Sequence, residues 1–275
     1  MIEGGKLTFK KALVFIKRDF ILLASYRFSF YLQLFSIFFS VLTFYFISKM
    51  FEGVTIPSLE QYGGNYFSFV LIGIAFTTYM WTGLGSFSGS IRDEQMMGTL
   101  EAMLVTPTRA SRIILFSSLW DFIWTSLRVV IYLLIGIFLF NIDMGNANLF
   151  AALIVLILTV ICFSSMGIIS ASLIMVFKQG DPVTWIFSTA SGFLGGVFYP
   201  IAILPGWLQN LSYVLPITYS LRSMRHALLQ GYPLEALATD IFALIIFSII
   251  MLPLSILSFR YAIRRVKVDG SLTQY

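Results

Sequence analysis

The longest apolar run that contains neither a charged residue nor a proline, residues 149–177, limits the fold of the chain more than any other feature. A helix of about 20 predominantly apolar residues is long enough to cross a bilayer, and this run contains no acidic or basic side chain. The composition agrees, because 58% of the residues are apolar and 11% are charged, whereas soluble domains carry about 25% charged residues. The sequence therefore predicts an all-α integral membrane protein.

Six apolar segments are long enough to span a membrane. They cover residues 28–48, 66–91, 113–140, 149–177, 183–221 and 241–259. The fifth segment is interrupted by Pro200, Pro205 and Pro216, so it cannot form one straight helix. We expect six transmembrane helices in one domain, residues 28–275, because no linker or internal repeat marks a further domain.

The distribution of basic residues predicts that both termini are cytoplasmic. Lysine and arginine are enriched in cytoplasmic connections, and they gather before the first span, between the second and third, and after the last. The connections 51–65 and 141–148 contain none. This alternation accounts for the net charge of +5 without a nucleic acid partner. Arg222, Arg225 and His226 are the exception, because they fall on the external side and are expected at its water-exposed end.

Residues 1–27 are expected to form an amphipathic helix in the cytoplasmic membrane interface. Apolar residues such as Leu13 and Phe20 alternate with basic residues such as Lys10 and Lys11, and such helices bind membrane lipids. A cleaved signal peptide is not expected, since the segment is charged and lacks a small-residue cleavage pattern. The alternative is that the first span simply extends into the cytosol.

The connection between the second and third predicted spans is polar and reads RDEQMMGTLEAMLVTPTR (residues 92–109). Its apolar residues recur at helical spacing; they are Met96, Met97, Leu100, Met103 and Leu104. Pro107 ends the helix, because the residue before a proline disfavours the helical conformation. The sequence predicts a short amphipathic helix over residues 94–105 on the cytoplasmic side.

Two roles are open for this short helix. It can lie on the membrane surface with its methionines in lipid, but such helices usually have a basic polar face, and this one carries Glu94 and Glu101. Alternatively it docks on a protein partner, a role that methionines suit. Gly98 costs about 1 kcal/mol relative to alanine inside a helix, which is explained if another backbone approaches there. We favour the partner.

The same connection resembles the intracellular connection of permease subunits of the type-2 ATP-binding-cassette exporter family. The family pattern is an Arg/Glu pair, a Gly-Thr-Leu-Glu and a Thr-Pro, which here are Arg92, Glu94, Gly98, Thr99, Leu100, Glu101, Thr106 and Pro107. GGVFYP (residues 195–200), followed by LPGW (204–207) and LPITY (215–219), is similar to the fifth-span region of that family. The resemblance extends in order over nearly the whole chain.

This resemblance implies a non-enzymatic permease subunit in a bacterial or archaeal cell membrane. In the family, the helix after the second span seats in a cleft of a separate cytosolic ATPase, so residues 94–105 would be the cytoplasmic coupling helix. The chain has no G-x-x-x-x-G-K-[ST] loop, so ATP and Mg would bind to that ATPase, and no cofactor or metal is expected here. A second permease copy, identical or homologous, would complete a dimer.

Residues 198–230 are expected to form external re-entrant helices, since the prolines allow two short helices over residues 204–214 and 218–230. Irregular backbone at membrane depth requires surrounding protein or a water-filled cavity. We predict an external gate at Phe198, Tyr199 and Pro200, with a simple role in the aromatic belt open for Tyr199. The alternative is a loop lying on the headgroups, anchored by Trp207 and Tyr213.

Arg128 lies within the third predicted span, seven residues after Asp121. This spacing places the two side chains on one helix face about 10 Å apart, too far for a direct ion pair. Charges in spans usually face a cavity or a partner. Arg128 is a candidate for lining the transport path or binding a substrate headgroup, and a structural pairing is the alternative.

The expected cargo is amphiphilic, lipid-linked or drug-like, because an apolar lining rich in the 28 phenylalanines suits it better than a bare ion. An ion channel or ion-coupled transporter is the main alternative, although such proteins usually need polar rings or carboxylates near the midplane. A membrane-embedded enzyme is a third, but one histidine and one cysteine supply little acid–base or metal chemistry.

Overall fold

The computed structural model describes residues 2–54, 56–96, 98, 110–177 and 181–269. Within these ranges all regular structure is helical, as predicted. The elements are α1 (Ile2–Ser25), α2 (Arg27–Lys49), α3 (Pro57–Glu60), α4 (Tyr66–Met96), α6 (Ala110–Phe140), α7 (Leu149–Phe177), α8 (Pro182–Leu194), the 3-10 turn η1 (Ile201–Ile203), α9 (Gly206–Ser212), α10 (Pro216–Leu229) and α11 (Ala238–Asp269).

Five helices among the described residues are long and apolar enough to cross a membrane: α2, α4, α6, α7 and α11. The predicted fifth span differs, because its helical part, α8, has 13 residues and is about 20 Å long. A hydrocarbon core is about 30 Å thick. The six-span count is therefore not confirmed. Gly196 has φ +72°, which right-handed helices exclude, and Pro200 follows, so the chain leaves the helical path there.

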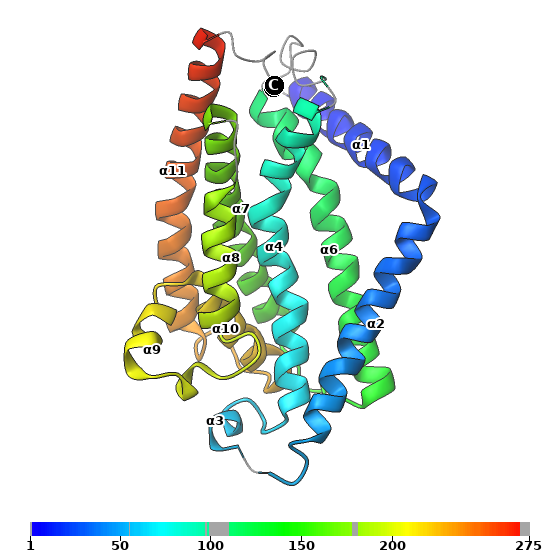
Figure 1. Cartoon of the computed structure of the whole chain (residues 1–275), viewed down its shortest axis with the longest axis vertical. Coiled ribbons are helices and arrows are strands. Elements are labelled where there is room, and N and C mark those ends of the chain that lie inside the picture. The colour runs from blue at the N-terminus through cyan, green and yellow to red at the C-terminus, as the bar shows by residue number, and fades with distance from the viewer. Residues whose placement is uncertain (1, 55, 97, 99–109, 178–180, 270–275) are drawn as a thin grey trace.

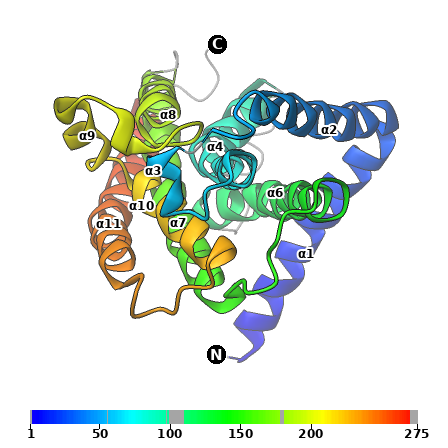
Figure 2. The same ribbon diagram turned by 90° about the horizontal axis from the view of Figure 1, so that it is seen from below.

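Helix α4 lies in the middle of the bundle and packs against α2, α6, α7, α8 and α10 (Figures 1 and 2). Of the most apolar 18-residue stretch of α4, 78% is buried, whereas 11% of the corresponding stretch of α2 is buried. Gly83 and Gly167 allow α4 and α7 to touch, because a Cβ on Gly167 would overlap the Gly83 carbonyl oxygen. Small residues commonly permit such close helix packing in membranes.

One end of the bundle gathers the basic segments, and we call it the basic end. It contains α1, the last turns of α4 with Arg92, the start of α6, the start of α8, and the end of α11 with Arg260 and Arg264 (Figure 1). The opposite end contains α3, η1, α9 and α10. Helix α1 and the end of α11 therefore lie at the same end of the molecule.

Helix α1 is separate from the first span. The two helices are broken at Tyr26, whose φ of −101° and ψ of 57° are not helical. From this elbow α1 leans across α6, while α2 runs along α6 toward the opposite end (Figure 2). The first span is thus not simply extended, and the placement of α1 in the membrane interface stays a prediction.

The two short helices predicted after the fifth span are present as α9 and α10. Helix α10 has buried residues along most of its length and packs against α4, α7, α8 and α11. Helix α9 is peripheral, and Trp207 in its first turn is exposed. The two pieces therefore differ, because α10 is part of the bundle and α9 lies at its edge.

Candidate functional site

The last turns of α4 contain the first two residues of the coupling pattern, Arg92 and Glu94. Arg92 is exposed. Glu94 Oε1 accepts a hydrogen bond of 3.2 Å from Arg18 Nη1, and Arg18 Nε also donates to Asp19. An ion pair therefore joins α1 to the last turns of α4, where the polar connection begins.

The predicted start of the coupling helix at Glu94 is wrong, because residues 94–96 continue α4. Gly98 has φ +67°, which also excludes an unbroken right-handed helix through this position. Among the described residues, a Cβ on Gly98 would meet no atom within 4 Å, and the positive φ by itself favours glycine at this turn. Thr99, Leu100, Glu101, Thr106 and Pro107 lie outside the described residues.

Asp181, which was not predicted from the sequence as a functional residue, joins three helices at the basic end. Its carboxylate caps α8 by accepting from the Thr184 backbone N–H at 3.0 Å. It also accepts from Ser88 Oγ of α4 at 3.0 Å and from Ser170 Oγ of α7. Thr184 Oγ1 in turn donates to the Leu84 carbonyl of α4 at 3.2 Å. Asp before Pro182 at a helix start is a recognisable capping signal.

The same contacts set the charge state of Asp181. Burial by itself would raise the pKa of the carboxyl group, but hydrogen bonds from Ser170, Thr184 and Ser88 outweigh burial and lower the pKa below its ordinary value. Hydrogen bonds to the ionised form stabilise it. At neutral pH the cluster therefore holds one negative charge where α4, α7 and α8 meet.

The predicted gate residues lie in the loop between α8 and η1, at the opposite end. Phe198 stacks on Phe44 of α2, with ring centroids 5.5 Å apart and an interplanar angle of 12°. The Tyr199 hydroxyl donates to the Phe193 carbonyl oxygen of α8. Pro200 is buried and precedes η1. The loop is thus tied both to its own helix and to α2.

The prediction that Arg225 lies at the water-exposed end is wrong, because 2% of its surface is exposed. Its Nε donates to the Phe69 carbonyl of α4 and its Nη2 to the Val197 carbonyl after α8, each at 3.0 Å. Burial lowers the pKa of Arg225 to about 9, so the guanidinium is charged at neutral pH. Gly73 makes room for this contact, because a Cβ there would overlap the Val197 oxygen.

Two neighbours of Arg225 also have partners within the chain. Arg222 forms an ion pair with Asp240 at the start of α11. The His226 ring contacts the rings of Tyr62 and Tyr232, at centroid distances of 5.0 and 4.8 Å. Burial lowers the pKa of His226 below its ordinary value, so the ring is neutral at pH 7. These three residues hold α10 to its surroundings.

Arg128 lies on α6, and its side chain is half-buried. Its Nε is buried without a hydrogen-bond partner, and no ion pair joins it to Asp121 in the described part of the chain. One turn earlier, Trp124 Nε1 donates to Gln33 Oε1 of α2 at 2.7 Å. A role of Arg128 in the path or in headgroup binding stays a prediction.

The sequence matches the family profile described as "ABC-2 type transporter" over residues 11–229. This chain belongs to the ABC-2 type transporter family. The ABC-2 permease is 25% identical to the inner membrane transport permease YadH of Escherichia coli over 170 residues, which cover 62% of this chain and 66% of YadH. It is 24% identical to the probable multidrug ABC transporter permease YbhR of E. coli over 159 residues (57% and 42%).

A third relative of this ABC-2 permease is nodulation protein J of Sinorhizobium fredii, 33% identical over 105 residues that cover 38% of this chain and 40% of the relative. The chain thus spans just under two thirds of YadH and less than half of the other two. The family profile confirms the resemblance seen in the polar connection and in the fifth-span region. It also confirms a transmembrane permease of an ABC transport system.

Proposed function

We propose that this ABC-2 permease is the transmembrane subunit of an exporter driven by a separate cytosolic ATPase. Its cargo would be amphiphilic, lipid-linked or drug-like and would leave the cytoplasm or the inner leaflet. Two permease copies would flank the path, and the basic end would face the cytoplasm. The printed names of YadH and YbhR, a transport permease and a probable multidrug permease, support this assignment.

The observation that carries the proposal is the position of α4. Helix α4, which leads into the polar connection (residues 92–109), is also the most buried of the candidate spans, with 78% of its most apolar 18-residue stretch buried. It contacts helices on both sides of the bundle. A force applied to the connection would therefore act directly on the centre of the molecule rather than on its edge.

Two polar contacts would transmit that movement at the basic end. Arg18–Glu94 ties α1 to α4, and the Asp181 cluster ties α4 to α7 and to the start of α8. Helix α8 then leads to Phe198, Tyr199 and Pro200, which we propose as the external gate. Helices α9 and α10 would be the external re-entrant pieces, with buried α10 the deeper of the two.

The test is co-purification of the permease with its cognate ATPase, combined with ATP hydrolysis in proteoliposomes. Glu101→Arg and Gly98→Trp change the polar connection, and we expect each to abolish ATPase binding and cargo-stimulated hydrolysis. Glu60→Arg is the matched control, because this exposed carboxylate lies on α3 at the opposite end. It is expected to leave both properties unchanged.

Wild-type binding and transport in both connection variants would show that residues 94–105 are not the docking element. Candidate lipids, glycolipids and drugs are compared in the same liposomes by their stimulation of ATP hydrolysis. Movement of solute by the purified permease without ATPase would contradict the proposal and would favour a channel or an ion-coupled transporter.

A further inference from the structure

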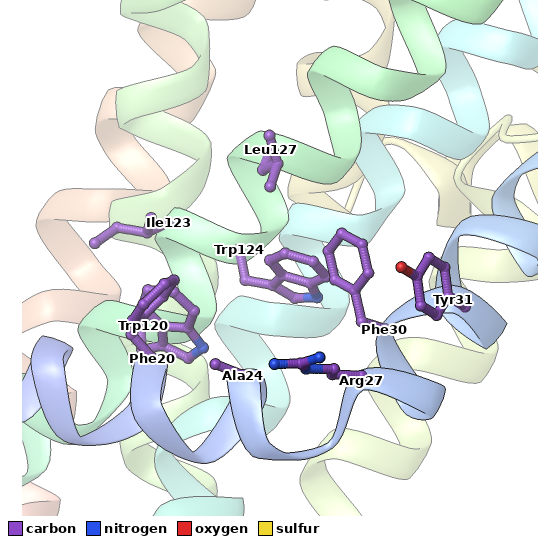
Figure 3. Close-up of a pocket in the computed structure, with 9 residues that line it drawn as sticks. All are labelled: Phe20, Ala24, Arg27, Phe30, Tyr31, Trp120, Ile123, Trp124 and Leu127. Carbon is purple, nitrogen blue, oxygen red and sulfur yellow. The ribbon is translucent and has the colours of Figure 1, made fainter.

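The elbow between α1 and α2 encloses a cavity against α6 (Figure 3). Because the chain turns at Tyr26, α1 and α2 diverge and meet α6 at two separate places. Phe20 of α1 packs edge-on against Trp120, with centroids 5.7 Å apart. Phe30 of α2 packs against Trp124 at 5.6 Å. These two aromatic pairs form the walls, and the space between them stays open.

The cavity has a volume of about 380 Å³, within the range of about 300–1,000 Å³ that small-molecule sites occupy. Its lining is aromatic or aliphatic except for one charged residue, Arg27. The indole N–H of Trp124 is already used by Gln33, so Trp124 presents mainly its apolar ring to the cavity. The interior therefore suits a hydrocarbon chain.

Arg27 supplies a positive charge to this apolar site. Its guanidinium extends below Trp124 toward Ala24 (Figure 3). Arg27 is exposed, and the contacts found in the described part of the chain include no hydrogen bond or ion pair of its side chain. An arginine in this state can bind a phosphate through paired N–H donors. The charge complements an anion rather than a cation or a neutral sugar.

The location of the cavity identifies the kind of molecule that reaches it. It lies at the first turns of the candidate spans Arg27–Lys49 and Leu115–Phe140, on the basic end. Tryptophan and tyrosine are enriched at this depth, where headgroups meet acyl chains. Phe20 and Tyr31 on the rim are 55% and 57% exposed, so the cavity opens sideways to lipid. The cytoplasmic leaflet is rich in anionic lipids.

We propose that this elbow cavity binds an anionic phospholipid of the cytoplasmic leaflet. One acyl chain occupies the aromatic slot between the elbow and α6, and the phosphate is held by Arg27. The bound lipid fills the angle between the interfacial helix and the first span. The assignment to the cytoplasmic leaflet rests on the proposed orientation, in which the basic end faces the cytoplasm. The site lies away from the polar connection and needs neither ATP nor the ATPase, so its test is separate from that of the exporter function.

The experiment measures lipid retained by the full-length permease after purification, using native mass spectrometry with added phosphatidylglycerol or phosphatidylethanolamine of the same acyl chains. The wild-type chain is expected to retain phosphatidylglycerol preferentially. A basic residue near an anionic surface contributes about 1 kcal/mol, so Arg27→Gln is expected to lower phosphatidylglycerol affinity about fivefold, and Arg27→Lys to retain most of it. Arg260→Gln, which removes an exposed charge on α11 at the same end, is the matched control and is expected to have no effect.

A second variant tests the slot itself. Ala24→Trp places a large ring in the cavity from an exposed position on α1, so it is expected to displace the acyl chain and to reduce retention of both lipids. Size-exclusion elution as in the wild type verifies that each variant is folded. The proposal is overturned if Arg27→Gln and Ala24→Trp retain phosphatidylglycerol as the wild type does, or if Arg260→Gln lowers retention equally, which would indicate unspecific attraction to the basic end.

Discussion

Asp181 shows how one side chain can organise three helices. Its carboxylate caps α8 and accepts from serines of α4 and α7. Nearby polar side chains in spans, such as Thr82 and Thr125, join helices in pairs at 2.6 Å, but they carry no charge. Through the Asp181 cluster, a movement of α4 would therefore be transmitted to α7 and α8 together.

Asp181→Ala is expected to lower the free energy of unfolding by about 1–2 kcal/mol, the usual cost of removing a helix cap. Asp181→Asn, which keeps an acceptor oxygen, should lose less. The measurement is thermal unfolding of the purified chain in detergent. Unchanged unfolding of Asp181→Ala would show that the cluster adds no stability.

The pH dependence of this difference has a defined sign. The pKa of Asp181 in the folded chain lies below its ordinary value of 3.8, so the ionised group stabilises the fold above about pH 4. That stabilisation is lost as the pH falls through the lower, folded-state pKa. The stability advantage of the wild type over Asp181→Asn should therefore narrow below pH 4 and be constant between pH 5 and 7. A gap that widens on acidification would contradict this assignment.

At the scale of whole helices, the close contact between α4 and α7 depends on glycine. A Cβ on Gly167 would overlap backbone of Gly83, and a Cβ on Gly83 would lie 2.6 Å from the Phe163 Cβ. Backbone atoms cannot turn aside as a flexible side chain does, so the two helices would have to separate.

Gly167→Ala is expected to destabilise the chain by about 1–3 kcal/mol, the usual cost of overpacking. Gly85→Ala on α4 is the matched control, because a Cβ at Gly85 would meet no atom of the described residues within 4 Å. It should be neutral or stabilising by up to about 1 kcal/mol, since glycine weakens a helix. Thermal unfolding of both variants in one detergent decides the point, and equal melting temperatures would rule out the close contact.

Across the whole molecule, Arg225 connects parts that are far apart in the sequence. It lies on α10 and donates to Phe69 of α4 and to Val197 in the loop that carries the proposed gate. Its guanidinium also lies 3.5 Å from the centroid of the Phe69 ring. The opposite end of the bundle is thus assembled around a buried cation rather than around apolar contacts alone.

Arg225→Met is expected to destabilise the permease by about 1–3 kcal/mol, because it removes the hydrogen bonds that the guanidinium donates to two buried carbonyl groups. This corresponds to a fall of several degrees in Tm, accompanied by faster proteolysis near residues 198–214. Arg264→Met, an exposed arginine on α11, serves as the control. If both variants melt alike and resist protease alike, Arg225 does not hold the loop in place.

Much of the helical layout followed from the sequence. Residues 149–177 form α7 with the predicted bounds, and α2, α4 and α6 differ from prediction by a few residues at their ends. Helix α11 extends well past the predicted residue 259, because its charged last turns lie outside any hydropathy signal. The fifth span was overestimated, since hydropathy does not register that Gly196 turns the backbone.

The candidate site was less accessible to sequence reasoning. The polar connection and the loop with the proposed gate carry local motifs that resemble the family, and both lie within the residues that match the family profile. Asp181 and Arg225 act through partners about 90 and 150 residues away, and no spacing within a single segment reveals such contacts. The sequence predicted two separate helices that meet near residue 27, but the elbow cavity depends on the angle between them and on how both pack against α6.

The sequence by itself determined that the chain is a helical membrane protein of the ABC-2 family, and where its long helices run. Only the tertiary structure decided which helix is central. The most apolar 18-residue stretches of α2 and α4 have similar mean hydropathy, 1.8 and 1.5, yet 11% of the first and 78% of the second is buried. The reason is that lipid tails are as apolar as a protein interior. Hydropathy therefore separates membrane from water, while the order of helices within the membrane depends on small residues, hydrogen bonds and shape.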